Sequence, residues 1–120
     1  MNEIHYSHES LIDLIDIERY ITEDLASPKA AKNTVKKITR KVCLLKDHAE
    51  LGARLSSIID IETDYRFLVS GNYISFYRID GNDIYVIRII YGGRDYVSIL
   101  FDSESDAPEV ELDDNEPLTL

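Results

Sequence analysis

The residues best suited to chemistry follow a break in an apolar run, in the stretch IRIIYGGRDYVSILF at residues 87–101. The two glycines end a predicted strand and turn the next side chain, Arg94, out of the pleat. Tyr91 and Tyr96 flank this break. A guanidinium beside phenols can stabilise a phosphate or bind a partner, but proton transfer also requires a positioned acid or base. An Arg94–Asp95 ion pair at an ordinary surface turn is the alternative interpretation.

The sequence shows no other pattern of a cofactor or metal site. It has neither a GxxxxGK(S/T) phosphate loop nor a GxGxxG loop, and its histidines and cysteine do not cluster at metal-ligand spacing. We therefore predict no cofactor and no metal. His5, His8 and His48 are interpreted as surface residues, and Cys43 as a packed thiol in an apolar helical pattern. A single cysteine also fits a reducing cytoplasm, which is the location that we expect.

Two helices are predicted ahead of the sheet. Apolar residues recur every three or four positions over about residues 8–25, and Ser7 is the expected N-cap. Ser27 and Pro28 mark a second start, because serine caps a helix and proline suits its first turn. The second apolar stripe consists of Ala31, Val35, Ile38, Val42 and Leu45. Residues 7–46 should therefore form an antiparallel helical hairpin.

The pattern changes to β-branched and aromatic residues in the second half of the chain. Strands are predicted over about residues 64–69, 72–79 and 83–90. The SGN and DGN segments between them favour hairpins, since Gly71 and Gly81 can adopt the positive φ that such turns require. Residues 96–101 (YVSILF) are interpreted as a further short strand or an edge extension, and NEIHYS as a candidate first strand.

The predicted fold class is α+β, with an N-terminal helical hairpin packed on a three- to four-stranded antiparallel sheet. A chain of 120 residues suffices for one domain, which we place at residues 1–101. Residues 102–120 hold eight of the 23 acidic residues and none of the 13 basic ones, which predicts a flexible acidic tail. The domain keeps 15 acidic and 13 basic residues, and this near-neutral balance argues against binding bulk nucleic acid. No apolar run approaches the ~20 residues of a membrane helix.

The element order and the segment YRFLVSGNYISFYRIDGNDIYVIRIIYGGRD resemble the RelE/ParE superfamily of toxins from type II toxin–antitoxin systems, over most of residues 3–101. In that family an arginine opens the second strand, a VGxYxxxYRI hairpin follows, and the last strand ends in a small residue and arginine–aspartate. The matching positions here are Arg66, Val69, Gly71, Tyr73, Tyr77, Arg78, Arg88, Gly93, Arg94 and Asp95. The segment LLKDHAELGARL is also similar to a family passage, but lacks its usual proline.

The resemblance implies that one end of the sheet faces the target or the antitoxin. The residues that it implies for this binding are Arg66, Tyr73, Tyr77, Arg88, Tyr91 and Arg94. If the protein is an enzyme, the resemblance implies cleavage of mRNA, with Arg94 and Tyr96 as candidate catalytic residues. Nuclease members use lysines on the second strand, an arginine on the third and a C-terminal tyrosine. Those positions here hold Tyr65, Phe67, Ile74 and Leu100.

Because only Arg94 keeps the residue type of the nuclease members, the ParE-like branch is favoured. The resemblance then implies a toxin of a plasmid stabilisation system, which inhibits growth by binding a target such as DNA gyrase and is neutralised by a cognate antitoxin. Two alternatives stay open. One is a ribosome-dependent mRNA endonuclease acting on the ribosome and its messenger. The other is a non-toxic binding module of the same fold, in which the acidic tail covers the cationic end of the sheet.

Overall fold

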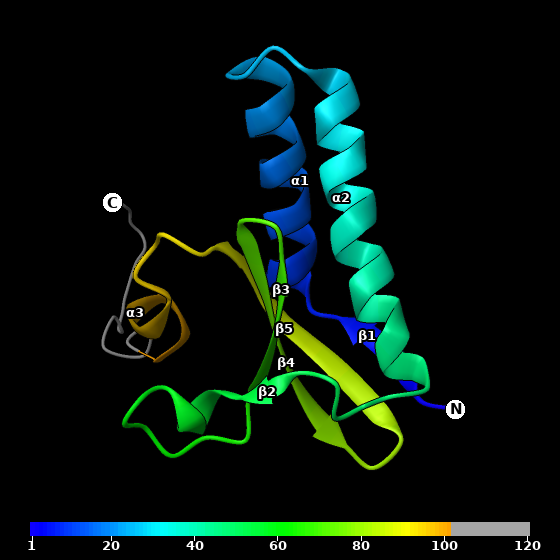
Figure 1. Cartoon of the computed structure of the whole chain (residues 1–120), viewed down its shortest axis with the longest axis vertical. Coiled ribbons are helices and arrows are strands. Elements are labelled where there is room, and N and C mark those ends of the chain that lie inside the picture. Colours follow the sequence, from blue (N-terminus) through cyan, green and yellow to red (C-terminus); the bar gives the residue numbers. More distant parts are fainter. Residues whose placement is uncertain (102–120) are drawn as a thin grey trace, which may run out of the picture.

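The computed structural model describes residues 1–101 of the chain (Figure 1). Its elements are β1 (Glu3–Tyr6), α1 (His8–Glu23), α2 (Pro28–Cys43), η1 (Leu44–Lys46), β2 (Ala53–Arg54), η2 (Leu55–Ser57), β3 (Arg66–Ser70), β4 (Tyr73–Asp80), β5 (Asp83–Tyr91) and α3 (Tyr96–Phe101). The predicted acidic tail, residues 102–120, lies outside the described residues. Within the described part, no helix has the length and apolar character needed to cross a membrane.

The predicted helical hairpin is present, and α1 and α2 lie side by side in opposite directions (Figure 1). Both predicted caps are confirmed. The Ser10 N–H donates to Ser7 Oγ at 3.0 Å, and the Ala30 N–H donates to Ser27 Oγ at 3.3 Å. These bonds satisfy amides that have no partner inside the first turn of a helix. The start of each helix is therefore set by its own local sequence.

Two details at the helix ends differ from the predictions. α1 ends at Glu23, two residues before the predicted end, because the connecting loop takes Ala26 into a left-handed conformation with φ of 54°. Cys43, predicted as a packed thiol, is exposed. It follows the buried Val42 on α2 and so lies beside the apolar stripe instead of within it.

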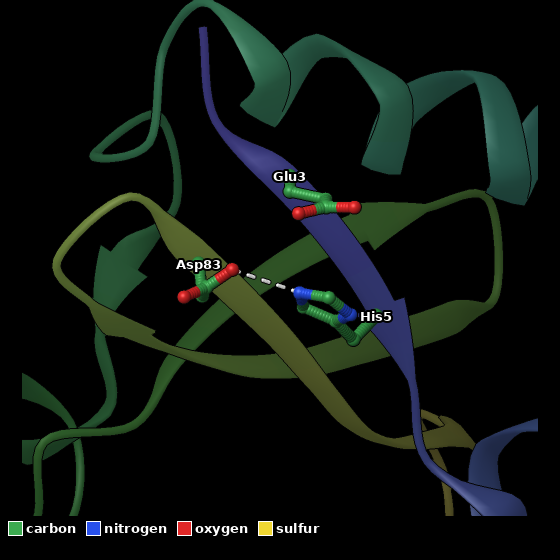
Figure 2. A group of neighbouring side chains, drawn as sticks. All are labelled: Glu3, His5 and Asp83. Atoms are coloured by element: carbon green, nitrogen blue, oxygen red, sulfur yellow. Dashed lines mark hydrogen bonds and ion pairs between the residues drawn. The ribbon is translucent and has the colours of Figure 1, made fainter.

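The sheet has five strands in the order β1-β5-β4-β3-β2. β3, β4 and β5 are joined by antiparallel pairings, as predicted, and Gly71 and Gly81 take the expected positive φ in the hairpin turns. β2, which was not predicted, pairs antiparallel with β3. The strand count exceeds the predicted three to four because β1 and the two-residue β2 add short edges. β1 lies parallel to β5 (Figure 2), with Ile4 opposite Ile84 and Tyr6 opposite Val86. The sheet is therefore mixed, whereas an antiparallel sheet was predicted, because the helical hairpin carries the chain back across the sheet before the next strands begin. The α+β class is confirmed.

The prediction of a strand at residues 96–101 is wrong, because this segment forms the helix α3. Its apolar residues pack against the sheet face opposite to α1 and α2, where Tyr96 and Leu100 join a cluster around Phe76. The spacing from Tyr96 to Ile99 and Leu100 is that of one helical face. A continuous apolar run of six residues does not distinguish a strand from a short helix.

Each face of the sheet thus carries its own hydrophobic cluster, although the face opposite the helices stays open around His5 and Asp83. α1 and α2 bury one face, and the core there is formed by Ile17, Ile21, Ala31, Ile38, Val42, Leu45, Leu68, Tyr77, Ile84, Val86 and Ile89. On the other face, Leu55, Phe76 and Ile90 are the buried centre of the second cluster, which η2 and α3 help to cover. The end of β5 lies where the chain crosses from one face to the other (Figure 1).

Candidate functional site

The end of β5 is shaped by a tight turn that contains the two glycines. The Gly92 N–H donates to Asn72 O at 2.8 Å, and the Arg94 N–H donates back to Tyr91 O at 3.0 Å. A Cβ at position 93 would lie 2.6 Å from Tyr91 Cε2, so glycine lets the half-exposed tyrosine ring lie directly against the backbone, and a larger residue would displace this ring. The turn leaves Arg94 exposed at the end of the sheet.

Tyr73 and Tyr91 lie beside this turn, and Tyr20 of α1 lies near Tyr73. The rings of Tyr73 on β4 and Tyr91 on β5 meet edge to face with 5.9 Å between their centroids. Burial raises the pKa of the Tyr73 hydroxyl, and the nearby Tyr20 of α1 and Tyr91 raise this pKa further. Both Tyr20 and Tyr91 are about half exposed. We call Tyr20, Tyr73, Tyr91 and Arg94 the rim.

A shallow hollow of about 240 Å³ lies next to the rim, between the β3–β4 turn and the end of β5. Its lining consists of Val69, Gly71, Asn72, Ile74, Tyr91, Gly92 and Gly93. The lining is apolar apart from Asn72 and the Tyr91 hydroxyl. Such a surface suits an apolar side chain of a protein partner better than a phosphate.

Asp95 does not pair with Arg94. Its carboxylate instead accepts hydrogen bonds from the Ser98 hydroxyl at 2.9 Å and the Ser98 N–H at 3.4 Å, in the first turn of α3. Within residues 1–101, Arg94 takes part in no ion pair. The surface ion pair considered as an alternative for Arg94 is therefore absent, and its guanidinium is available to a partner as far as the described residues are concerned.

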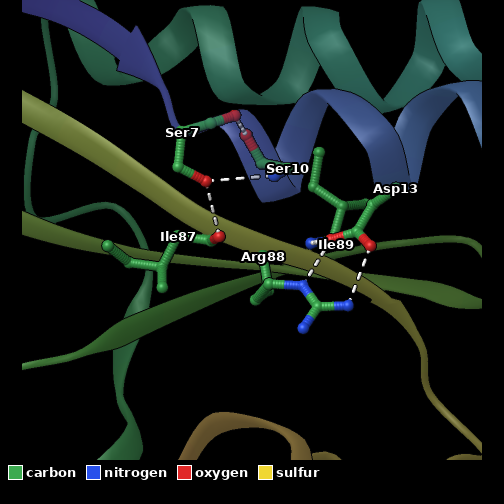
Figure 3. A network of polar contacts seen from close by, with 6 residues as sticks. All are labelled: Ser7, Ser10, Asp13, Ile87, Arg88 and Ile89. Carbon is green, nitrogen blue, oxygen red and sulfur yellow. Dashed lines mark hydrogen bonds and ion pairs between the residues drawn. The ribbon is translucent and has the colours of Figure 1, made fainter. Parts of the chain in front are cut away.

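Arg88, a predicted binding residue, is part of an internal clamp (Figure 3). Its Nε and Nη2 donate to the two oxygens of Asp13 on α1 at 2.8 and 2.9 Å, and the Ile89 N–H donates to the same carboxylate at 2.9 Å. The Asp13 side chain is only 11% exposed and that of Arg88 26%. These hydrogen bonds raise the pKa of the Arg88 guanidinium. The clamp fixes α1 to the edge of β5.

An irregularity in the β4–β5 pairing places Arg88 at this edge. Phe76 pairs with Arg88 but the next residue, Tyr77, pairs with Val86, so Ile87 is an extra residue on β5. A bulge of this kind bends the strand and re-aims the side chains beside it. The Ile87 carbonyl accepts a hydrogen bond from the Ser7 hydroxyl at 2.8 Å, which anchors the start of α1 to the bulge (Figure 3).

Tyr77 and Arg66, also predicted binding residues, hold the loop before β2. Tyr77 is 0% exposed; its hydroxyl accepts from the Gly52 N–H at 2.9 Å and donates to Ala49 O at 2.8 Å. Arg66 Nη1 donates to Gly52 O at 2.7 Å. Tyr77 therefore offers no surface to a partner. Arg66 opens β3 at the end away from the rim, because Ser70, at the other end of β3, pairs with Tyr73.

Tyr96, the second candidate catalytic residue, packs into the cluster on the far face of the sheet. Its ring lies 5.3 Å from that of the fully buried Phe76. Of the residues singled out in the sequence, the structure brings Tyr73, Tyr91 and Arg94 together at the rim. It places Arg66, Tyr77, Arg88 and Tyr96 in contacts within the domain.

A family model described as the ParE toxin of the type II toxin–antitoxin system parDE matches residues 4–96. The chain belongs to the ParE toxin family. Among solved structures, it is similar to a chain of a chromosomal ParDE toxin–antitoxin system from P. aeruginosa, with 24% identity and a TM-score of 0.64. That likeness covers 76% of this chain and 96% of the other, and it shows a shared fold. No curated protein gives a significant match.

The positions that the sequence resemblance aligns with catalytic groups of nuclease members hold aromatic or aliphatic residues in this chain, and these residues are partly buried. Tyr65, Phe67, Ile74 and Leu100 all pack against the cluster of Leu55, Phe76 and Ile90. The Tyr65 ring stacks on Phe101 of α3 with 5.7 Å between centroids. The face of the sheet that would hold such a site is thus used for packing α3 and η2.

Two residues of the site were missed in the sequence. Tyr20 lies within the apolar pattern predicted for residues 8–25, yet it is half exposed and lies near Tyr73. Asp13 was not singled out, because a carboxylate at a helical position usually faces solvent. Its position six residues after the Ser7 cap, next to an apolar stripe, is the available signal, since that side of α1 must contact the sheet.

Proposed function

We propose that this ParE-family chain is the toxin of a type II toxin–antitoxin pair that serves plasmid stabilisation and acts in the cytoplasm. It arrests growth by binding a protein target such as DNA gyrase through the rim. The observation that carries this proposal is the exposed Arg94 on a glycine turn beside Tyr91 and Tyr73. Arginine and tyrosine are the residues that most often dominate the binding energy of protein interfaces.

Binding without catalysis agrees with the chemistry of the rim. Cleavage of RNA requires a group that takes the proton of the 2′-hydroxyl. Asp95, the carboxylate next to Arg94, accepts hydrogen bonds from Ser98 in α3, and the raised pKa of Tyr73 keeps its hydroxyl protonated. A lone guanidinium supplies only charge stabilisation, so we favour inhibition of a protein target over an mRNA endonuclease.

A cognate antitoxin is the second proposed partner, and the outer surface of α1 supports it. Leu11, Ile12 and Ile15 are 46%, 41% and 53% exposed. These three residues lie within one turn and form an apolar patch on the hairpin, of the kind that a helix or an extended segment of a partner covers. We propose that the antitoxin binds there and across the sheet end, which would neutralise the toxin.

Growth and enzyme assays test the target. Induced expression should arrest growth, and the purified protein should inhibit the supercoiling activity of DNA gyrase in a concentration-dependent manner. Messenger RNA in a translating extract should stay intact. Cleaved messenger would instead establish the endonuclease, and normal growth at high expression would establish a non-toxic binding module.

A second experiment tests the antitoxin surface. Co-expression with the product of the neighbouring reading frame should restore growth. Ile15→Asp should keep toxicity while the protective effect of that product falls, because a charge on the α1 patch is costly to bury. Asp16→Ala, an exposed change next to it, is the matched control and should be protected like the wild type. Equal protection of both variants would place the antitoxin elsewhere.

A further inference from the structure

Within residues 1–101, one cluster of side chains outside the rim has the composition of a metal site (Figure 2). It comprises Glu3 and His5 on β1 and Asp83 at the start of β5. One ligand atom from each residue can be chosen so that all three lie within 4.8 Å of one another. The sequence pattern does not reveal this cluster, because His5 and Asp83 are 78 positions apart.

The backbone of two paired strands sets the positions of these groups. Ile4 and Tyr6 of β1 face the core under the helices, so the alternation of a strand points Glu3 and His5 to the opposite face. The parallel register puts Glu3 beside Asp83 and His5 beside Tyr85. Three donors on adjacent positions of two hydrogen-bonded strands are held more rigidly than donors on a loop.

The imidazole is already oriented toward the carboxylate. Its ring stacks on Tyr85 with 5.0 Å between centroids and an angle of 22° between the planes. His5 Nε2 lies 2.9 Å from Asp83 Oδ1. Adjacent ligands at about 2.1 Å from an octahedral ion are about 3 Å apart, so this pair already has the required separation. Glu3 is exposed and can turn its carboxylate inward.

We propose that Glu3, His5 and Asp83 bind a divalent first-row transition ion such as Ni²⁺ or Zn²⁺ on the open part of the sheet. A nitrogen donor favours these ions over Mg²⁺ and Ca²⁺, which prefer oxygen alone. Two carboxylates balance the charge of a divalent ion, and three protein ligands leave positions for water. The nearby Arg78 does not compete for the carboxylates, because its guanidinium lies over the Tyr85 ring at 4.6 Å.

Such an ion would tie the short edge strand β1 to β5. β1 has only four residues, and its pairing with β5 is the parallel one. Anything that binds the folded state alone stabilises it in proportion to the logarithm of its concentration. The ion should therefore raise the melting temperature and protect the N-terminal strand from exchange.

Calorimetric titration of the untagged, full-length protein with NiCl₂ and ZnCl₂ tests the site. We expect one saturable site in the wild type, and an affinity at least about tenfold lower in His5→Ala and in Asp83→Asn. His8→Ala removes an exposed histidine on α1 and should bind like the wild type. Paramagnetic Ni²⁺ should broaden the amide signals of residues 3–6 and 83–85 first.

Ion binding that does not require His5 would overturn the proposal. If His5→Ala binds as tightly as the wild type, the ions are held elsewhere, for example by the acidic residues after position 101, and His5 and Asp83 form an ion pair only. Absence of saturable binding by the wild type leads to the same conclusion. Glu3→Gln changes an exposed position and should leave the fold intact, so weaker ion binding by this variant would reflect loss of a ligand and not loss of folding.

Discussion

At the level of single residues, Asp13 takes the place of a neighbouring strand along the outer edge of β5. β1 ends at Tyr6 opposite Val86, and the Ile89 N–H beyond it donates to Asp13 instead of to a strand. The same carboxylate holds the Arg88 guanidinium with two hydrogen bonds. One side chain thus satisfies a backbone donor, neutralises a half-buried cation and docks α1.

Asp13→Ala should lower the free energy of unfolding by about 2 kcal/mol, because it leaves a partly buried charge and an amide without their acceptor. The matched control is Asp16→Ala, three residues further along α1, where an exposed pair with Arg19 spans 3.6 Å. Asp16→Ala should lower the free energy of unfolding by at most about 0.5 kcal/mol. Urea unfolding curves of the three proteins measure both values, and equal losses would show that the clamp does not stabilise the fold.

The hydroxyl of Tyr77 should make the free energy of unfolding decrease as the pH becomes alkaline. Burial is the main cause that raises the pKa of its hydroxyl above the ordinary value of 10.0. Because the folded-state pKa is the higher one, the unfolded chain loses this proton first as the pH rises. The stabilisation is complete below a pH of about 10 and is lost as the pH rises through the folded-state pKa.

Tyr77→Phe should therefore lose about 1–2 kcal/mol of stability at pH 7, where two hydrogen bonds disappear. The difference in free energy of unfolding between the wild type and Tyr77→Phe should become smaller as the pH is raised to about 11. Urea unfolding at the two pH values measures this difference. Tyr20→Phe, a change at a half-exposed position, serves as the control. A difference that stays constant with pH would contradict the linkage to Tyr77.

At the level of elements, the long helices and the hairpin strands could be predicted from the sequence because their signals are local. Serine caps, Pro28 and the glycine turns act within a few residues, and the structure confirms them. α3 could not be predicted, because a six-residue apolar run takes its conformation from the sheet that it covers. The two-residue β2 exists only through its pairing with β3.

The loop between α1 and α2 gives a test at this level. Ala26 has a φ of 54°, a conformation that costs a residue with a Cβ about 1 kcal/mol. Ala26→Gly should raise the free energy of unfolding by roughly 0.5–1 kcal/mol. Ala30→Gly, within the first turn of α2, should lower it by a similar amount. Thermal unfolding of the two variants and the wild type measures the direction of each change in stability. A destabilised Ala26→Gly would contradict the left-handed conformation of Ala26.

At the level of the whole molecule, the sheet carries a hydrophobic cluster on each face and the exposed rim residues at one end. α3 and η2 cover the face where nuclease relatives would carry their catalytic groups, whereas the glycine turn leaves Arg94 exposed at the end of β5. The family resemblance implied binding at this end of the sheet, which stays a prediction, and the glycine break predicted an Arg94 side chain turned out of the pleat. The sequence could not separate the rim residues from Arg66, Tyr77 and Arg88, because their partners come from distant segments.

The central claim is that the rim binds the target, and the concentration of purified protein that half-inhibits gyrase supercoiling tests it most directly. Arg94→Ala should raise this concentration at least tenfold, a loss of about 1.4 kcal/mol, while its unfolding curve stays that of the wild type. Arg54→Ala, which removes an exposed arginine on β2, should inhibit like the wild type. Full inhibition by Arg94→Ala would contradict the assignment of the rim.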